Sequence, residues 1–207
     1  MKNNNKHTMN KQLIILSLTV ALCLPTFAQQ EAEDFCRHEI SIGYGFHPVS
    51  GDSFYFGTYA SYDVDNIGAF YGAYTYFINK HVGVGGTYCF DPRMLTCSYY
   101  GTSNPLVADL DESCHSLMGH VKFNSIFRKY FTYYSKFDAG ICFWDYKLTE
   151  YQPELFEVVL PQKHCCFAWN VAVGVEAGND RIAGFVQCGV GMEGNFSLGI
   201  RYKFNGK

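Results

Sequence analysis

The chain has 207 residues, which is enough for one domain with a sizeable core or for one small barrel. Its net charge of −3 gives no footprint for nucleic acid, so we expect no nucleic acid among its partners. Charged residues make up 17% of the chain, below the roughly 25% of a typical soluble domain, and aromatic residues also reach 17%. This balance favours a chain with much apolar surface.

Residues 1–28 have the pattern of an export signal. Three lysines near the start supply positive charge, and the apolar stretch 13–24 is too short to cross a bilayer stably. A small-x-small cleavage site follows at 26–28. The sequence therefore predicts a cleaved signal peptide over 1–28 and a single mature domain over 29–207.

Eight segments of the mature chain alternate between apolar or aromatic residues and small or polar ones. A period of two is typical of a β-strand with two different faces. The predicted strands are 38–46, 67–78, 81–90, 114–127, 132–146, 165–177, 181–191 and 195–204.

The connections between these strands alternate in length. Long polar connections are predicted at 47–66, 91–113 and 147–164, and a brief one at 192–194. Tight connections are predicted between them at 79–80, 128–131 and 178–180. An up-and-down outer-membrane barrel has an even number of strands, short periplasmic turns and longer outer loops. The pattern predicts an all-β fold, an eight-stranded antiparallel transmembrane barrel with both termini in the periplasm.

The last strand shows the alternation most clearly. Phe196, Leu198, Ile200, Tyr202 and Phe204 form one row, and small or charged residues lie between them. The pattern alone does not decide which row faces the interior. A lipid-embedded barrel places the apolar row outside, whereas a soluble ligand-binding barrel of the lipocalin kind places it inside.

Six charged residues fall on the rows that a lipid-embedded barrel turns inward. Because eight strands leave a lumen just wide enough for side chains, and a buried charge is costly without a partner, we expect these residues to pair. This predicted lumen charge network, which would plug the barrel, consists of Glu39, Lys122, Asp138, Glu176, Arg201 and Lys203.

Eight cysteines remain after Cys23 of the leader is removed, an even number that permits disulfides in an oxidising compartment. Cys97 and Cys114 could staple one loop. Cys142 and Cys188 lie in the middle of predicted strands, where a cysteine more often acts as a small apolar residue. No spacing matches a zinc or haem motif.

The sequence offers little for catalysis. A hydrolase needs a nucleophile and a base within hydrogen-bonding reach, and the candidates are His115 and Ser116 beside Asp111 or Glu112. Because His115 and Ser116 are consecutive in a predicted strand, they should point in opposite directions. The histidines are scattered singly, so we expect no catalytic site, metal or cofactor.

These segments together resemble a known family, the small eight-stranded, porin-like outer-membrane barrels of the OmpA/OmpX type. The resemblance rests on the leader ending at 28, the hairpin 173–191 and the closing strand 195–204. It implies a Gram-negative outer-membrane location, contact with membrane lipid, and recognition of a terminal aromatic strand by the barrel-assembly machinery. Phe204 matches that aromatic, with Tyr202 and Ile200 behind it, although three residues follow it.

The leading hypothesis is a structural or surface-interacting barrel without enzymatic activity. Its long connections 47–66, 91–113 and 147–164 would meet an extracellular ligand or surface. A lipid-modifying outer-membrane enzyme and a soluble exported lipocalin-like barrel are the alternatives.

Overall fold

The computed structural model describes residues 35–48, 60–99, 106–127, 130–150 and 165–205. The chain separates into two units, Met1–Phe35 and Cys36–Lys207, and the second unit contains all the strands described below. The predicted signal peptide lies outside the described residues. Within these residues, no helix combines the length and the apolar character needed to cross a membrane.

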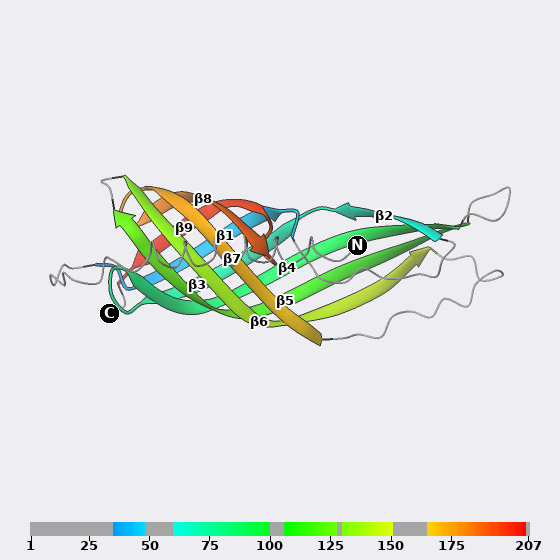
Figure 1. Ribbon diagram of the computed structural model, residues 1–207, viewed down its shortest axis with the longest axis horizontal. Coiled ribbons are helices and arrows are strands. Elements are labelled where there is room, and N and C mark those ends of the chain that lie inside the picture. The colour runs from blue at the N-terminus through cyan, green and yellow to red at the C-terminus, as the bar shows by residue number, and fades with distance from the viewer. Residues whose placement is uncertain (1–34, 49–59, 100–105, 128–129, 151–164, 206–207) are drawn as a thin grey trace, which may run out of the picture. The chain divides into compact units, whose positions relative to one another are not determined.

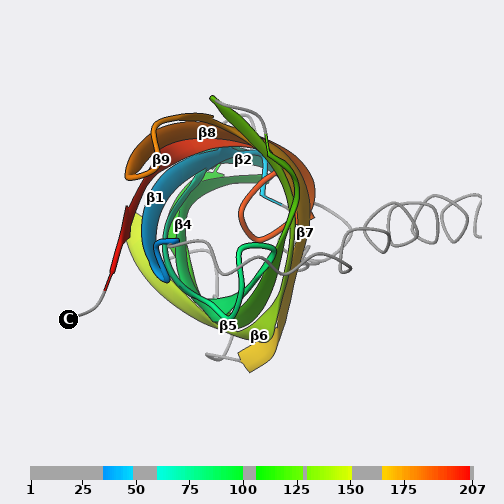
Figure 2. The same ribbon diagram turned by 90° about the vertical axis from the view of Figure 1, so that its left-hand side faces the viewer.

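The described residues form one antiparallel sheet that closes on itself (Figure 1). Its strands are β1 (His38–Phe46), β2 (Ala60–Asn66), β3 (Ala69–Phe77), β4 (Val82–Tyr99), β5 (Leu106–Phe127), β6 (Phe131–Glu150), β7 (Cys165–Gly178), β8 (Ile182–Gly191) and β9 (Phe196–Phe204). All except β2 form a ring, in which β1 pairs with β3 and β9 pairs with β1 along its whole length (Figure 2). The predicted eight-stranded antiparallel barrel is confirmed.

Three strands are much longer than the sequence predicts. β4 and β5 stay paired from Val82 and Phe123 out to Tyr99 and Leu106, so most of the predicted loop 91–113 is a strand ladder. β6 continues to Glu150, and β2 pairs with the far end of β4. Together, β2 and the segments 91–99, 106–113 and 144–150 form a four-stranded extension of the barrel wall, here called the protruding sheet (Figure 1).

The predicted loop 91–113 is wrong for an identifiable reason. Pro92 and a series of acidic residues interrupt the alternation of apolar and polar residues, which removes the sequence signal for a strand. The backbone ladder needs no apolar face, and it continues through Pro92, which pairs with Ser113. The remaining parts of the predicted long connections, 49–59, 100–105 and 151–164, lie outside the described residues.

Two of the predicted tight turns rest on asparagine side chains. Asn79 Oδ1 accepts hydrogen bonds from the backbone N–H groups of His81 and Val82, both at 2.8 Å. Asn179 Oδ1 accepts from Arg181 at 2.9 Å and from Ile182 at 2.6 Å in the same manner. These turns confirm the tight connections at 79–80 and 178–180.

The turn between β8 and β9 folds into the barrel rather than away from it (Figure 2). Met192 and Glu193 are buried, although the sequence pattern places 192–194 among the outer connections. Gly194 has a φ of +95°, and a side chain there would collide with the backbone of Phe46. The left-handed conformation at this glycine lets the chain dip into the lumen and return to β9.

The structure shows which row of each ring strand faces the lumen and which faces outward. Charged and polar side chains such as Glu39 (1% exposed) face the lumen. The apolar rows face outward, with Ile42 at 63% and Phe167 at 67% exposure. The alternation predicted for the ring segments of β4, β5, β6, β7 and β9 is confirmed, and the structure places the apolar row of each segment outside.

Candidate functional site

The barrel lumen holds two groups of charged side chains. The lower cluster lies toward the end of the barrel where β1 begins and β9 ends. It consists of Glu39, Lys122, Glu176, Arg201 and Lys203. The contacts of Lys122 join β5 to β1 and β7 across the lumen, whereas Lys203 and Glu39 are opposite one another on the neighbouring strands β9 and β1.

Lys122 is the centre of the lower cluster. Its Nζ lies 2.6 Å from Glu39 Oε1 and 2.5 Å from Glu176 Oε1. Arg201 Nε lies 2.5 Å from Glu176 Oε2, and Lys203 Nζ lies 3.3 Å from Glu39 Oε2. Each carboxylate therefore meets at least two cations, which offsets the cost of removing it from water.

The upper cluster lies deeper in the barrel and includes Lys136, Asp138 and Glu193. Lys136 Nζ pairs with Glu193 Oε1 and lies 3.1 Å from Asp138 Oδ1. Gln187 Nε2 donates to Glu193 Oε2 at 2.7 Å, which holds the inward-folded turn against β8. Asp138 therefore belongs to a different group from the other five residues of the predicted network.

Asp138 is held by neutral donors as well as by Lys136. Thr87 Oγ1 donates to Asp138 Oδ1 at 2.9 Å, and Asn170 Nδ2 donates to Oδ2 at 3.0 Å. His120 lies between the hydroxyls of Thr75 and Thr87, with both ring nitrogens 2.9 Å from a hydroxyl oxygen. These bonds link the neighbouring strands β3, β4, β5, β6 and β7 along the inner wall of the ring.

Two lysines face each other where the clusters meet. Lys122 and Lys136 are opposite one another in the β5–β6 pairing, an arrangement that is unfavourable for like charges. The structure relieves it by sending Lys122 to Glu39 and Glu176, and Lys136 to Asp138 and Glu193. Four cations then balance four carboxylates over the two clusters.

Sequence reasoning missed two members of the upper cluster. Lys136 has the same parity as Asp138 on β6, so extending that row by two residues would have included it. Glu193 had no comparable signal, because it lies in a turn and reaches the lumen only through the inward fold of that turn.

Little space remains between the two clusters. A lumen cavity bordered by Glu39, Tyr71, Lys122 and Lys136 has a volume of about 20 Å³. A cavity needs about 10–15 Å³ to hold one water molecule. This part of the lumen therefore has room for roughly one water and no room for an organic ligand.

The lumen ends in a further ion pair where the protruding sheet begins. Arg93 donates to Asp91 Oδ2 from Nε at 2.9 Å and from Nη2 at 2.6 Å. The same guanidinium lies 5.5 Å from the centre of the buried Trp144 ring. The pair forms a charged upper boundary to the lumen.

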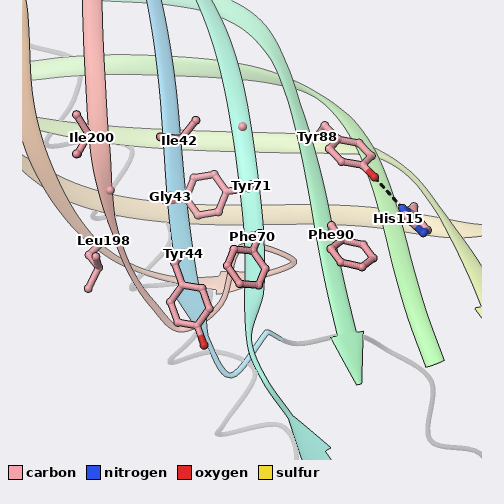
Figure 3. A pocket seen from close by; sticks show the side chains of 12 residues that line it. Ile42, Gly43, Tyr44, Phe70, Tyr71, Tyr88, Phe90, His115, Leu198 and Ile200 are labelled. Carbon is pink, nitrogen blue, oxygen red and sulfur yellow. Dashed lines mark hydrogen bonds between the residues drawn. The ribbon is translucent and has the colours of Figure 1, made fainter. Parts of the chain in front are cut away.

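The predicted catalytic candidates are separated by the barrel wall. Ser116 is buried in the lumen, whereas His115 lies on the outer side, where its Nδ1 is 2.7 Å from the Tyr88 hydroxyl (Figure 3). These two residues therefore cannot act as a nucleophile and its base. Over the described ranges, no group of three or more His, Cys, Asp or Glu side chains is placed to hold a metal ion.

The strand register excludes the Cys97–Cys114 disulfide that the sequence permits. Cys97 is opposite Ala108 on β5, six residues from Cys114. Six residues of extended strand span about 20 Å, whereas the Cα atoms of a disulfide lie within about 7 Å. Cys114 instead lies in the lumen, and its Sγ is 3.7 Å from Ser116 Oγ.

The outer wall of the ring is apolar across its described strands. Its outward rows contain no Asp, Glu, Lys or Arg over the described, ring-paired lengths of these eight strands. Ile42, Phe70, Tyr88 and Ile200 surround a hollow of about 790 Å³, which forms because Gly72 places no side chain among them (Figure 3). A Cβ at Gly72 would meet nothing closer than the backbone oxygen of Ser41, at 3.9 Å.

The three residues of the predicted assembly signal also lie on this outer wall. Ile200, Tyr202 and Phe204 are opposite Ile42, Ile40 and His38 at the seam that closes the ring. Phe204 stacks on the His38 ring at 5.2 Å and on the Tyr202 ring at 5.8 Å.

No protein family matches the sequence, and no curated protein matches it. Solved structures do resemble the fold. Two are crystal structures of Ail, the attachment invasion locus protein of Yersinia pestis. The one in complex with the heparin analogue sucrose octasulfate is 17% identical, with a TM-score of 0.44, and the match covers 83% of this chain and 100% of Ail. The other is 16% identical, with a TM-score of 0.45 and the same coverage.

A third similar structure is the outer membrane protein OprG from Pseudomonas aeruginosa. It is 14% identical, with a TM-score of 0.46, and the match covers 83% of this chain and 98% of OprG. At such identities and TM-scores these three structures assign neither a ligand nor a role to this chain.

Proposed function

We propose that this chain is an integral outer-membrane barrel whose wall faces lipid, whose lumen is closed by charged side chains, and whose protruding sheet contacts partners outside the cell. One observation carries this proposal, namely the direction of the two faces of the ring. Over the described ring-paired lengths of the strands, the Asp, Glu, Lys and Arg side chains face the lumen and the apolar rows face outward.

The outer wall has the composition that a bilayer requires. Aliphatic side chains such as Ile42, Leu117 and Val173 lie between two bands of exposed aromatic residues. One band, near the protruding sheet, contains Phe46, Phe70, Phe143, Phe167 and Phe196, and the other, near the chain ends, contains Tyr74, Phe131, Tyr133 and Tyr202. Aromatic girdles at both interfaces are typical of outer-membrane barrels.

A soluble ligand-binding barrel requires the opposite arrangement. It would need an apolar lumen with room for a ligand and an exterior that water can solvate. Here the ring exposes more than twenty large hydrophobic residues while it buries Glu39, Lys122, Lys136 and Glu176. Such a surface in water would be a strong aggregation hazard.

The closed lumen favours a structural or contact role over transport. Both charged clusters cross the lumen, and the cavity between them holds about 20 Å³. Solute passage would require several buried ion pairs to separate at once, which is costly because it leaves charges without partners.

The protruding sheet supplies the contact surface. Within the described residues, 144–150 of β6 pair with β5 alone, because β7 ends its pairing at Phe143. β2 likewise pairs only with β4 among the described strands. Open edges can accept a further strand from another protein, so backbone hydrogen bonding would supply the affinity.

The two tryptophans allow a direct test of the lipid-facing wall. Trp169 is 40% exposed on the outer side of β7, and Trp144 is 2% exposed in the lumen. The variants Trp144→Phe and Trp169→Phe each leave one emitter. After folding into vesicles that contain phospholipids brominated along their acyl chains, we expect strong quenching of Trp169 and little quenching of Trp144.

Equal quenching of the two, or none of either, would contradict the proposed orientation. Fractionation of cells that produce the full chain tests the location independently. We expect the protein in the outer-membrane fraction, with a gel mobility that changes on boiling and an N-terminus that begins at Gln29. A soluble protein without that shift would favour the ligand-binding barrel.

A further inference from the structure

A row of sulfur and hydroxyl side chains crosses the upper lumen on four neighbouring strands. Cys89 on β4 is opposite Ser116 on β5, which is opposite Cys142 on β6, which is opposite Cys166 on β7. The first three are buried, and Cys166 is partly exposed. None of these side chains belongs to the two charged clusters.

The sulfur atoms of Cys142 and Cys166 lie closer together than van der Waals contact allows. Their Sγ atoms are 2.8 Å apart. Carbon atoms in van der Waals contact lie about 3.5–4.0 Å apart, and sulfur is larger than carbon. Opposite residues of antiparallel strands have Cα atoms about 4.5–5.5 Å apart, within the range that a disulfide spans, so no change of register is needed.

We propose that Cys142 and Cys166 form a disulfide bond in the exported protein. The proposal rests on the export that is part of the proposed function, because disulfides form and persist in oxidising compartments. The oxidant is the exchangeable disulfide of a thiol oxidase. The two thiols lose two protons and two electrons, and the oxidant disulfide becomes two thiols.

The order of the two thiol–disulfide exchange steps is set by which sulfur the oxidant can reach first. The partly exposed Cys166 thiolate attacks the oxidant disulfide and forms a mixed disulfide, releasing one oxidant thiolate. The adjacent Cys142 thiolate then attacks the Cys166 sulfur and releases the second. Trp144 Nε1–H donates to Cys166 Sγ at 3.1 Å, which holds this sulfur toward Cys142.

The bond would lie at the point where the ring gives way to the protruding sheet. Cys166 is the second residue of β7, and beyond Phe143 β6 continues without β7 beside it. A covalent link there fixes the start of β7 to β6. The disulfide would keep β6 and β7 paired when a bound partner exerts force on the protruding sheet.

The neighbouring cysteines provide controls. Cys165 precedes Cys166 directly and is exposed, because alternation turns it to the outer wall. Cys114 also lies in the lumen, but its opposite residue on β6 is Trp144. If Cys142 bonds to Cys114 instead, the proposed pairing is wrong.

Peptide mapping of the full chain tests the pairing. The protein is extracted in detergent without reductant, its free thiols are blocked with N-ethylmaleimide under denaturing conditions, and it is digested with trypsin. Cleavage should yield peptides 137–147, with Cys142 as its one cysteine, and 164–181, with Cys165 and Cys166. We expect these two peptides to be linked before reduction and separate after it.

The variants Cys165→Ser and Cys166→Ser identify the sulfur involved. The linked peptide should persist in Cys165→Ser and disappear in Cys166→Ser. Two free, alkylated thiols at these positions, or a link from 137–147 to 94–122, would overturn the proposal. A membrane-embedded protein with both thiols alkylated would contradict the disulfide alone, whereas a soluble protein with the link would contradict only the proposed membrane location.

Discussion

The same strands pass through two different surroundings. On β6, Ile141 and Phe143 of the outer row are exposed and apolar within the ring, and the next members of that row, Asp145 and Lys147, are exposed and charged. On β5, Leu117 is exposed in the ring, and Asp111 occupies the same row in the protruding sheet. The outer row changes from apolar to charged side chains where the ring ends.

The backbone pairing does not change at this boundary. β4 and β5 remain in one register from Phe123 to Leu106, with no shift where the ring ends. A ladder of hydrogen bonds can therefore form with either kind of side chain outside. Lipid around the ring and water around the protruding sheet, as proposed above, would account for the difference between the two outer rows.

The largest difference in stability should appear when a lysine of the ring and a lysine of the protruding sheet are each replaced by alanine. Lys122→Ala removes the central cation of the lower cluster, which lies within 2.6 Å of both Glu39 and Glu176, and breaking a buried ion pair costs about 3–5 kcal/mol. Urea titration of the protein folded in lipid vesicles measures this loss. Lys147→Ala, at an exposed position of the protruding sheet, should change the free energy of unfolding by less than about 0.5 kcal/mol. Similar effects for both variants would mean that Lys122 is solvated in the lumen.

Adding a charge to the outer row should have the next largest effect. Val173→Arg places a guanidinium on the outer wall of the ring, where such a change costs about 2–4 kcal/mol at the bilayer midplane. Met94→Arg is the matched change on β4 of the protruding sheet, at a residue of similar exposure, and should cost less than about 0.5 kcal/mol. The same urea titration checks both, and an equal cost at the two positions would show that lipid does not cover Val173.

The smallest of the three losses of stability should come from a substitution in the turn between β8 and β9. Gly194→Ala forces a left-handed conformation on alanine and brings its Cβ against the backbone of Phe46, at a cost of about 1–3 kcal/mol. Gly184→Ala is the control, because its Cβ would meet nothing closer than 3.8 Å on the outer wall. A Gly194→Ala protein as stable as the control would mean that the turn holding Glu193 can adapt without strain.

Much of the ring could be predicted from the sequence because its strands have two unlike faces. β1 was predicted with its observed bounds, and the rows of β7 and β9 follow the predicted alternation. The loop predicted at 91–113 is wrong because the alternation stops at the edge of the ring while the pairing continues. An alternating pattern indicates that the two faces of a strand have different surroundings. It gives no signal for a strand that has water on both faces.

The lumen was predictable by residue type and less so by partner. Strand parity places Lys122, Glu176 and Arg201 on one side of the wall, but it cannot say which carboxylate a cation on a distant strand will reach. Glu193 enters from a turn, and Asp138 pairs with Lys136 rather than with the lower cluster. These partners depend on the curvature of the closed sheet, which brings β5 across from β1.

The sequence by itself determined the number of ring strands, their approximate bounds and which residues share a face, because side chains alternate strictly along an extended chain. The tertiary structure decided which face is inside, how the charges divide into two clusters, and that three strands continue beyond the ring. These features depend on closure, because only a closed ring has a lumen in which charges from distant strands can meet.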